Sequence, residues 1–124
     1  MSAGHRDTPP VSARAQLLAW RCRPLGARDA CSPGQTAAQL AELPGWRAEG
    51  VSIEREYRFP DYRSTIGFVD AVAAIAETQD HHPELAVAYG RCLVRWSTHS
   101  ANAVTMNDFA CAALTDAAFE PYAR

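Results

Sequence analysis

The hydrophobic pattern of this chain changes its period at Pro60-Asp61, and that change restricts the fold more than any other feature. In residues 51–59, apolar side chains alternate with polar ones, which is typical of a β-strand with one face in water. Residues 62–79 contain no proline, and their apolar side chains, such as Ile66 and Val69, recur at helical spacing. A strand followed directly by a long amphipathic helix predicts a fold that mixes both kinds of element.

Weaker signals of the same kind lie on both sides of this pair. They are a helix at residues 35–43, a short strand at 46–49, two β-rich runs at 85–90 and 91–99, and a final helix at 106–118. The predicted order is therefore α-β-β-α-β-β-α. It indicates an α+β fold, in which a four-stranded antiparallel sheet has three helices packed on one face.

The last two predicted strands form a hairpin, and its register decides which side chains meet. With Gly90-Arg91 as the two loop residues of a type II′ turn, Tyr89 pairs with Cys92. The same register places His82 opposite His99. Directly opposed residues in an antiparallel pair have Cβ atoms about 4.5–5.5 Å apart, so we expect these two imidazoles to lie close together.

Three of the four histidines, His81, His82 and His99, therefore converge at one end of the predicted hairpin. One alternative is a zinc site, although adjacent residues of an extended chain point apart and are poor partners for one ion. A second is a polar cluster that only caps the hairpin. The third is general acid–base catalysis, which suits imidazoles because they titrate near neutral pH. We favour the third, and expect neither a metal nor a cofactor.

Charge and hydropathy argue against several classes of function. The formal net charge is −2, which provides no bulk attraction to nucleic acid or to an anionic membrane. No stretch approaches the roughly 20 apolar residues of a membrane span. The four cysteines form no C-x-x-C pair, so we expect reduced thiols and a cytoplasmic protein. Cys92 and Cys111 fall on apolar positions, and pairing of Cys22 with Cys31 is the alternative.

The first 33 residues differ in composition from the rest of the chain. Residues 1–33 contain 5 Arg and 2 Asp, a balance of +3, together with 4 of the 8 prolines. Residues 34–124 contain 7 Arg and 12 acidic residues, a balance of −5. We therefore divide the chain into a Pro/Arg-rich N-terminal arm at 1–33 and a compact domain at 34–124. Within the arm, residues 11–20 predict a short helix that docks elsewhere, and a mitochondrial presequence is the alternative.

A compound motif extends over about residues 40–119, and the spacing between its parts matters as much as the residues themselves. Its strongest part comprises Glu77, His81-His82-Pro83-Glu84, Tyr89, Ser97-Thr98-His99 and Asp108. With this motif the chain resembles the pterin-4a-carbinolamine dehydratases, and the spacing matches that family without a gap. The resemblance implies dehydration of 4a-hydroxytetrahydropterin to quinonoid dihydropterin, a step in tetrahydrobiopterin recycling.

The resemblance also implies a role for each motif residue. His81 and His99 would donate and accept protons, His82 would bind and orient the pterin, and Asp108 would set the charge and tautomer of the imidazoles. The substrate-binding set would comprise Glu77, Pro83, Trp46 and Thr98, with Glu77 also acting on the imidazoles and Trp46 forming a wall of the site.

One departure from the family pattern lies in the turn after His99. The family usually has glycine there, whereas this chain has Asn102-Ala103, followed by Val104-Thr105. If that turn borders the bound pterin, we expect pterin binding to be altered. Related proteins form dimers and tetramers, and the wide apolar face of the helix at 62–79 also favours a homodimer or homotetramer.

A binding function is the main alternative to catalysis. The wider family includes a dimerisation cofactor of a homeodomain transcription factor and dehydratase-like assembly factors for RuBisCO in carboxysomes. In such a module a protein partner would bind the exposed sheet face, for example at Glu54 or Glu56. A pure assembly factor does not need its histidines, and this chain keeps all three together with Asp108, so we favour the enzyme.

Overall fold

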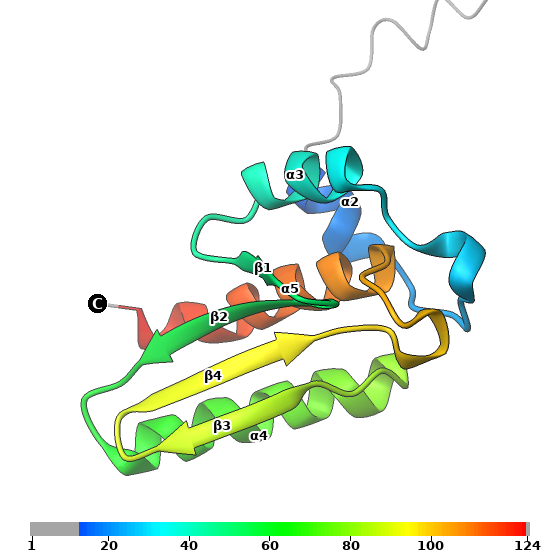
Figure 1. Ribbon diagram of the computed structural model, residues 1–124. Coiled ribbons are helices and arrows are strands. Elements are labelled where there is room, and N and C mark those ends of the chain that lie inside the picture. The colour runs from blue at the N-terminus through cyan, green and yellow to red at the C-terminus, as the bar shows by residue number, and fades with distance from the viewer. Residues whose placement is uncertain (1–12, 124) are drawn as a thin grey trace, which may run out of the picture.

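The computed structural model describes residues 13–123, and it contains one open, fully antiparallel sheet. The strands are β1 (Arg47–Glu49), β2 (Ser52–Arg58), β3 (Glu84–Ala88) and β4 (Arg91–Trp96). They lie in the order β1-β2-β4-β3, so β3 and β1 are the edges (Figure 1). The predicted α+β class and the four-stranded antiparallel sheet are confirmed.

Within residues 13–123, four α-helices accompany the sheet: the three predicted for the domain and the one expected within residues 11–20. They are α2 (Ala13–Ala19), α3 (Pro33–Ala41), α4 (Tyr62–Gln79) and α5 (Met106–Phe119), with short 3-10 turns η1 (Ala27–Asp29), η2 (His99–Ala101) and η3 (Glu120–Tyr122). Helices α4 and α5 lie behind the sheet and cover one face of it (Figure 1). Helix α2 packs against α5, and Leu40 of α3 packs against the same hydrophobic core.

The core lies between this sheet face and helices α4 and α5. Its largest fully buried side chains include Tyr57, Trp96, Phe68 and Phe109. Alternate residues of β2 and β4 supply the sheet side, as the period of two requires. Cys92 and Cys111 are both fully buried, which agrees with their expected role as small hydrophobes.

The other sheet face carries charges, and Glu54 lies among them. It pairs with Arg47 on β1 and with Arg95 on β4, where the shortest Arg95 contact is 2.7 Å. Glu54 is only 3% exposed, so it is not the freely exposed carboxylate that the alternation predicted. The two arginines come from neighbouring strands, and their hydrogen bonds and charges hold the pKa of Glu54 below its ordinary value although burial alone would raise it.

The predicted register of the second hairpin is wrong by two residues. Ala88 pairs with Arg91 and Val87 with Cys92, so the loop residues are Tyr89 and Gly90. Neither has the positive φ that a type II′ turn needs at its first position. A shift of two residues keeps each side chain on its predicted face. It does, however, remove the predicted opposition of His82 and His99, which both lie outside the strands.

The end of β2 explains this register. Phe59 donates from its backbone N to the carbonyl oxygen of Gly90 at 2.8 Å. A Cβ at residue 90 would lie 2.8 Å from the carbonyl oxygen of Phe59, so only glycine permits this approach. The glycine is therefore needed for a tertiary contact and not for the conformation of the turn.

Residues 13–33, which we assigned to the arm, contact the rest of the domain through their buried side chains. Leu17 of α2 is 3% exposed and belongs to the hydrophobic core, and Leu25 is also buried. The helix predicted within residues 11–20 is present at Ala13–Ala19. Residues 1–12 lie outside the described part, and the division of the chain at residue 33 stays a prediction.

Two neighbouring leucines test whether α2 is part of the cooperative fold. Leu17→Ala should lower the free energy of unfolding by about 2–4 kcal/mol, because it leaves a cavity beside α5. Leu18→Ala is the matched control, since Leu18 is 37% exposed and should cost less than about 1 kcal/mol. Denaturant unfolding of both variants measures the difference. Equal, small losses would mean that the arm is a separate unit.

Candidate functional site

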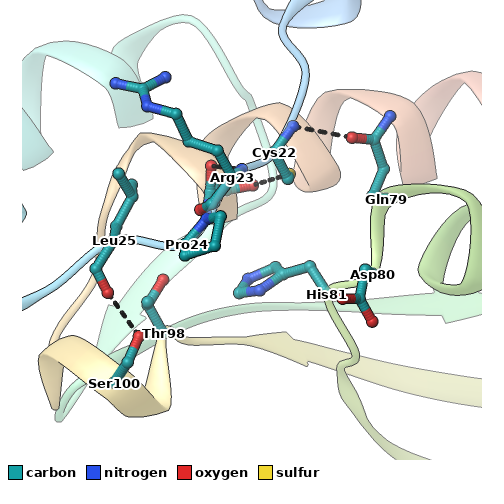
Figure 2. Close-up of a pocket in the computed structure, with 10 residues that line it drawn as sticks. Cys22, Arg23, Pro24, Leu25, Gln79, Asp80, His81, Thr98 and Ser100 are labelled. Carbon is teal, nitrogen blue, oxygen red and sulfur yellow. Dashed lines mark hydrogen bonds between the residues drawn. The ribbon is translucent and has the colours of Figure 1, made fainter.

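A cavity of about 280 Å³ lies where α4 ends, beside the loop after β4 and the start of α5. Its lining residues are Cys22, Arg23, Pro24, Leu25, Gln79, Asp80, His81, Thr98, Ser100 and Asn107. Figure 2 shows His81 directed into this space, opposite Pro24 and Thr98. Two of the predicted site residues, His81 and Thr98, therefore line one cavity.

The backbone at the end of α4 directs His81 into the cavity. Asp80 ends the helix in the left-handed conformation, with φ 51°. The backbone N of His81 then donates to the carbonyl oxygen of Ala76 at 3.1 Å, which closes the helix end. The imidazole of His81 lies parallel to the indole of Trp96, with ring centroids 5.5 Å apart.

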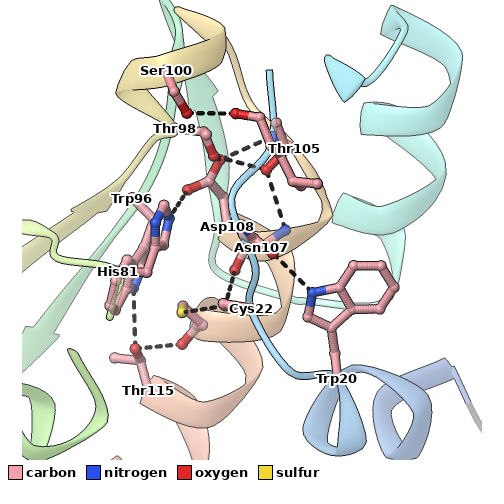
Figure 3. Close-up of polar contacts among 12 residues, drawn as sticks. Trp20, Cys22, His81, Trp96, Thr98, Ser100, Thr105, Asn107, Asp108 and Thr115 are labelled. Atoms are coloured by element: carbon pink, nitrogen blue, oxygen red, sulfur yellow. Dashed lines mark hydrogen bonds and ion pairs between the residues drawn. The ribbon is translucent and has the colours of Figure 1, made fainter. Parts of the chain in front are cut away.

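His81, which lines the cavity, pairs with the fully buried Asp108, which does not. His81 Nε2 lies 2.6 Å from Asp108 Oδ1, and the Asp108 side chain is completely buried (Figure 3). Burial alone would lower the pKa of His81. The hydrogen bond and the charge of Asp108 outweigh it, with smaller contributions from Cys22 and Asp80, so the pKa of His81 lies above its ordinary value.

Local helix chemistry explains why Asp108 is available in this place. Thr105 caps α5, and the backbone N of Thr105 donates to Asp108 Oδ2 at 2.9 Å, which completes a capping box. Thr98 Oγ1 also donates to Asp108 Oδ2, at 2.7 Å. One carboxylate therefore starts the helix, fixes the loop after β4 and accepts a hydrogen bond from His81.

The other predicted site residues are more dispersed. His82 Nε2 lies 2.8 Å from Glu77 Oε2, but both side chains are exposed and neither lines the cavity. Pro83 follows His82 and directly precedes β3. His99 is exposed on η2, and within residues 13–123 its side chain has no hydrogen bond or ion pair. Trp46 is buried away from the cavity, where its Nε1 donates to Asp116 Oδ1 at 3.0 Å.

The turn after His99 accommodates its unusual sequence. Asn102 ends η2 with φ 49°, in the left-handed region where glycine is the usual residue. Asparagine is among the few other residues that adopt this conformation readily. The backbone of this turn therefore does not require the glycine of the family pattern.

No motif or periodicity in the sequence predicted that residues 22–25 form one wall of the cavity. Asn107 holds this wall, since its Nδ2 donates to the carbonyl oxygen of Arg23 at 2.7 Å and its Oδ1 accepts from Trp20 Nε1 at 2.9 Å. Gln79 Oε1 accepts from the backbone N of Cys22 at 2.9 Å, and Ser100 Oγ donates to the carbonyl oxygen of Leu25. The only available signal was the predicted docking helix just before this segment.

This arrangement is suited to proton transfer. It offers an imidazole with a raised pKa, anchored on a buried carboxylate and open to a cavity. Within residues 13–123, no group of three or more His, Cys, Asp or Glu side chains has the geometry to hold a metal ion. No helix in the same range has the length and apolar character needed to cross a membrane.

Comparison with known proteins assigns most of this chain to one family. A family model described as pterin 4 alpha carbinolamine dehydratase matches residues 29–118. The chain is 50% identical over 95 residues to a protein of Paracidovorax citrulli, a match that covers 73% of this chain and 82% of the relative. A protein of Chromobacterium violaceum is 41% identical over 83% of this chain and 95% of its own length. Both carry provisional names as pterin-4-alpha-carbinolamine dehydratases.

Two solved structures are also similar. A Brucella melitensis protein described as a transcriptional coactivator/pterin dehydratase superposes with a TM-score of 0.70 at 34% identity, over 72% of this chain and 97% of that one. A pterin dehydratase-like protein described as a RuBisCO assembly factor in the alpha-carboxysome gives a TM-score of 0.51 at 22% identity, over 59% of this chain and 84% of that one. The second likeness supports the fold alone.

Proposed function

Because this chain belongs to the pterin-4-alpha-carbinolamine dehydratase family, we propose that it dehydrates 4a-hydroxytetrahydropterin to quinonoid dihydropterin in tetrahydrobiopterin recycling. The observation that carries the proposal is the buried His81–Asp108 pair beside a cavity. The family match supplies the substrate class, and the pair supplies a proton donor suited to the reaction.

In the proposed reaction His81 acts as the general acid. Its Nε2 is engaged by Asp108, which leaves Nδ1 to deliver a proton to the 4a-hydroxyl group. The C4a–O bond then breaks and water leaves with the bonding electrons. Loss of the N5 proton lets the N5 lone pair form the C4a=N5 double bond, so the products are dihydropterin and water. The raised pKa of His81 keeps the acid form populated near neutral pH.

The roles of the remaining motif residues are part of the same proposal. His99 would accept the N5 proton, and it lies one residue after Thr98, which lines the cavity. His82, held by Glu77, would orient the pterin at the cavity entrance together with Pro83. Trp46 lies beside Asp116, so a role as a site wall would require the pterin to reach beyond the cavity described above.

The direct test is a comparison with the uncatalysed reaction. 4a-Hydroxytetrahydropterin is generated by a coupled hydroxylase, and its dehydration is followed with and without this protein. We expect the rate to rise in proportion to protein concentration and to saturate with substrate. A rate equal to the spontaneous one at micromolar protein would contradict the proposal.

A chelator distinguishes imidazole catalysis from metal catalysis. Dialysis against a strong chelator should leave kcat unchanged, because protonation by His81 needs no Lewis acid. A second sample that is dialysed without chelator controls for losses during handling. Loss of activity that zinc restores would instead indicate a metal-bound hydroxide.

The β3 edge favours a second candidate function, binding of protein partners. Leu85, Val87 and Tyr89 are exposed large hydrophobic residues on or directly after this strand. An uncovered edge strand can pair with another chain. We propose that the protein is cytoplasmic and forms a homo-oligomer. Light scattering at micromolar concentration tests the oligomeric state.

A variant on the same edge tests partner binding. If Leu85→Arg abolished the biological activity while dehydration continued unchanged, the protein would act as a binding module.

A further inference from the structure

Cys22 and Cys111 lie side by side at the base of the cavity wall, although 89 positions separate them in the chain. Their sulfur atoms are 3.6 Å apart. We propose that these two cysteines form an oxidation site, in which a peroxide converts them to an intramolecular disulfide that links the N-terminal segment to α5. The site goes beyond the dehydratase reaction and does not depend on it.

The distance between the sulfurs favours the bond. A disulfide has an S–S length of about 2.05 Å, so the sulfurs need to approach by about 1.5 Å. Cys22 lies between α2 and η1, outside any helix, so no ladder of helical hydrogen bonds holds its backbone. Cys111 lies on α5 and is completely buried, so the mobile partner would be Cys22.

The two thiols differ in the way that a stepwise oxidation requires. Cys22 lines the cavity and is only partly buried, so a small oxidant can reach it. Its hydrogen bond from Cys111 lowers the pKa of Cys22, and His81 lowers it further, against burial and the charge of Asp108. The same contact and burial raise the pKa of Cys111, so Cys22 ionises before Cys111. Cys22 is therefore the cysteine that reacts first with the oxidant, and Cys111 is the resolving cysteine.

The chemistry balances with hydrogen peroxide as the oxidant. The Cys22 thiolate attacks one peroxide oxygen, the O–O bond breaks, and hydroxide leaves, which gives a sulfenic acid. The sulfur of Cys111 then attacks Cys22, the S–S bond forms, and the S–O bond breaks. The thiol proton of Cys111 leaves with that oxygen as water. Two electrons pass from the two sulfurs to the peroxide, and a thiol reductant reverses the change.

The disulfide would fix one wall of the candidate active site. Cys22 belongs to the segment of residues 22–25 that faces His81 across the cavity (Figure 2). In the reduced protein, hydrogen bonds with the side chains of Asn107, Gln79 and Ser100 hold this wall. A covalent bond to α5 would add a constraint that persists when those hydrogen bonds open.

Peptide mapping of the full-length protein tests the proposal directly. The reduced protein is treated with hydrogen peroxide, free thiols are alkylated, and the digest is analysed without reductant. We expect one cross-linked peptide that joins Cys22 to Cys111, while Cys31 and Cys92 are alkylated. Four alkylated cysteines, a Cys22–Cys31 link, an intermolecular link or overoxidised Cys22 would each overturn the proposal.

Thermal unfolding provides a second measurement with matched variants. A link that closes a loop of this length should raise Tm by about 10 °C on oxidation, and a reductant should reverse the rise. Cys22→Ser should abolish the rise. Cys31→Ser is the matched control, because Cys31 is also partly buried and should leave the rise unchanged. A rise that survives in Cys22→Ser, or no rise in the wild type, would contradict the proposed site.

Discussion

His81→Gln should lower kcat for pterin dehydration by about 10²–10⁴-fold, the usual contribution of one positioned acid–base group. The glutamine amide can still donate a hydrogen bond to Asp108, which keeps the buried carboxylate satisfied. It does not titrate, so it cannot deliver a proton to the 4a-hydroxyl group. The measurement is the coupled dehydration assay, with the spontaneous rate subtracted.

His82→Gln is the comparison that separates proton transfer from binding. His82 is the adjacent residue but is exposed and paired with Glu77, so its loss should raise KM more than it lowers kcat. His99→Ala should lower kcat in the same range as His81→Gln if His99 accepts the N5 proton. The double variant should then lose less than the product of the single losses, because the two groups act as a unit. Wild-type kcat in His81→Gln would contradict the proposed mechanism.

The elements with strong periodicity could be predicted from the sequence, and the tertiary contacts could not. The helix at 62–79 has the same bounds in the structure, since Asp61 caps its start and Asp80 ends it. The register of the β3–β4 hairpin depends on the approach of Phe59 to Gly90, which no local pattern reveals. A glycine in a predicted turn suggests a turn type, while here it provides space for another strand.

At the candidate site, too, motif residues could be predicted from the sequence and tertiary contacts could not. The family motif identified His81 and Asp108, which the structure joins at 2.6 Å. The wall at residues 22–25 lies before the family match begins at residue 29, so no motif could indicate it. Its position depends on hydrogen bonds to Asn107, which is far along the chain and carries no pattern of its own. Burial of Glu54 was likewise unpredictable, because it needs arginines from two other strands.

Asp108→Ala should be among the most destabilising single substitutions in this protein, with a loss of about 3–5 kcal/mol near neutral pH. The carboxylate is fully buried and accepts hydrogen bonds from His81, from Thr98 Oγ1 and from the backbone N of Thr105. Alanine leaves all three donors without their acceptor and removes the capping box of α5. Asp61→Ala is the matched control, because Asp61 caps α4 but is exposed, so its loss should be much smaller.

The loss of stability in Asp108→Ala should also depend on pH, and the titration of His81 determines the direction. The pKa of His81 is raised in the folded protein, so its charged form gains stability from Asp108. That contribution is fully present below the unfolded pKa of about 6.5 and is lost as the pH rises through the folded value. Denaturant unfolding from about pH 6 to 9 should therefore show the difference between wild type and Asp108→Ala shrinking as the pH rises. A difference that grows with pH would mean that His81 is neutral in the folded protein, and it would remove the proposed general acid.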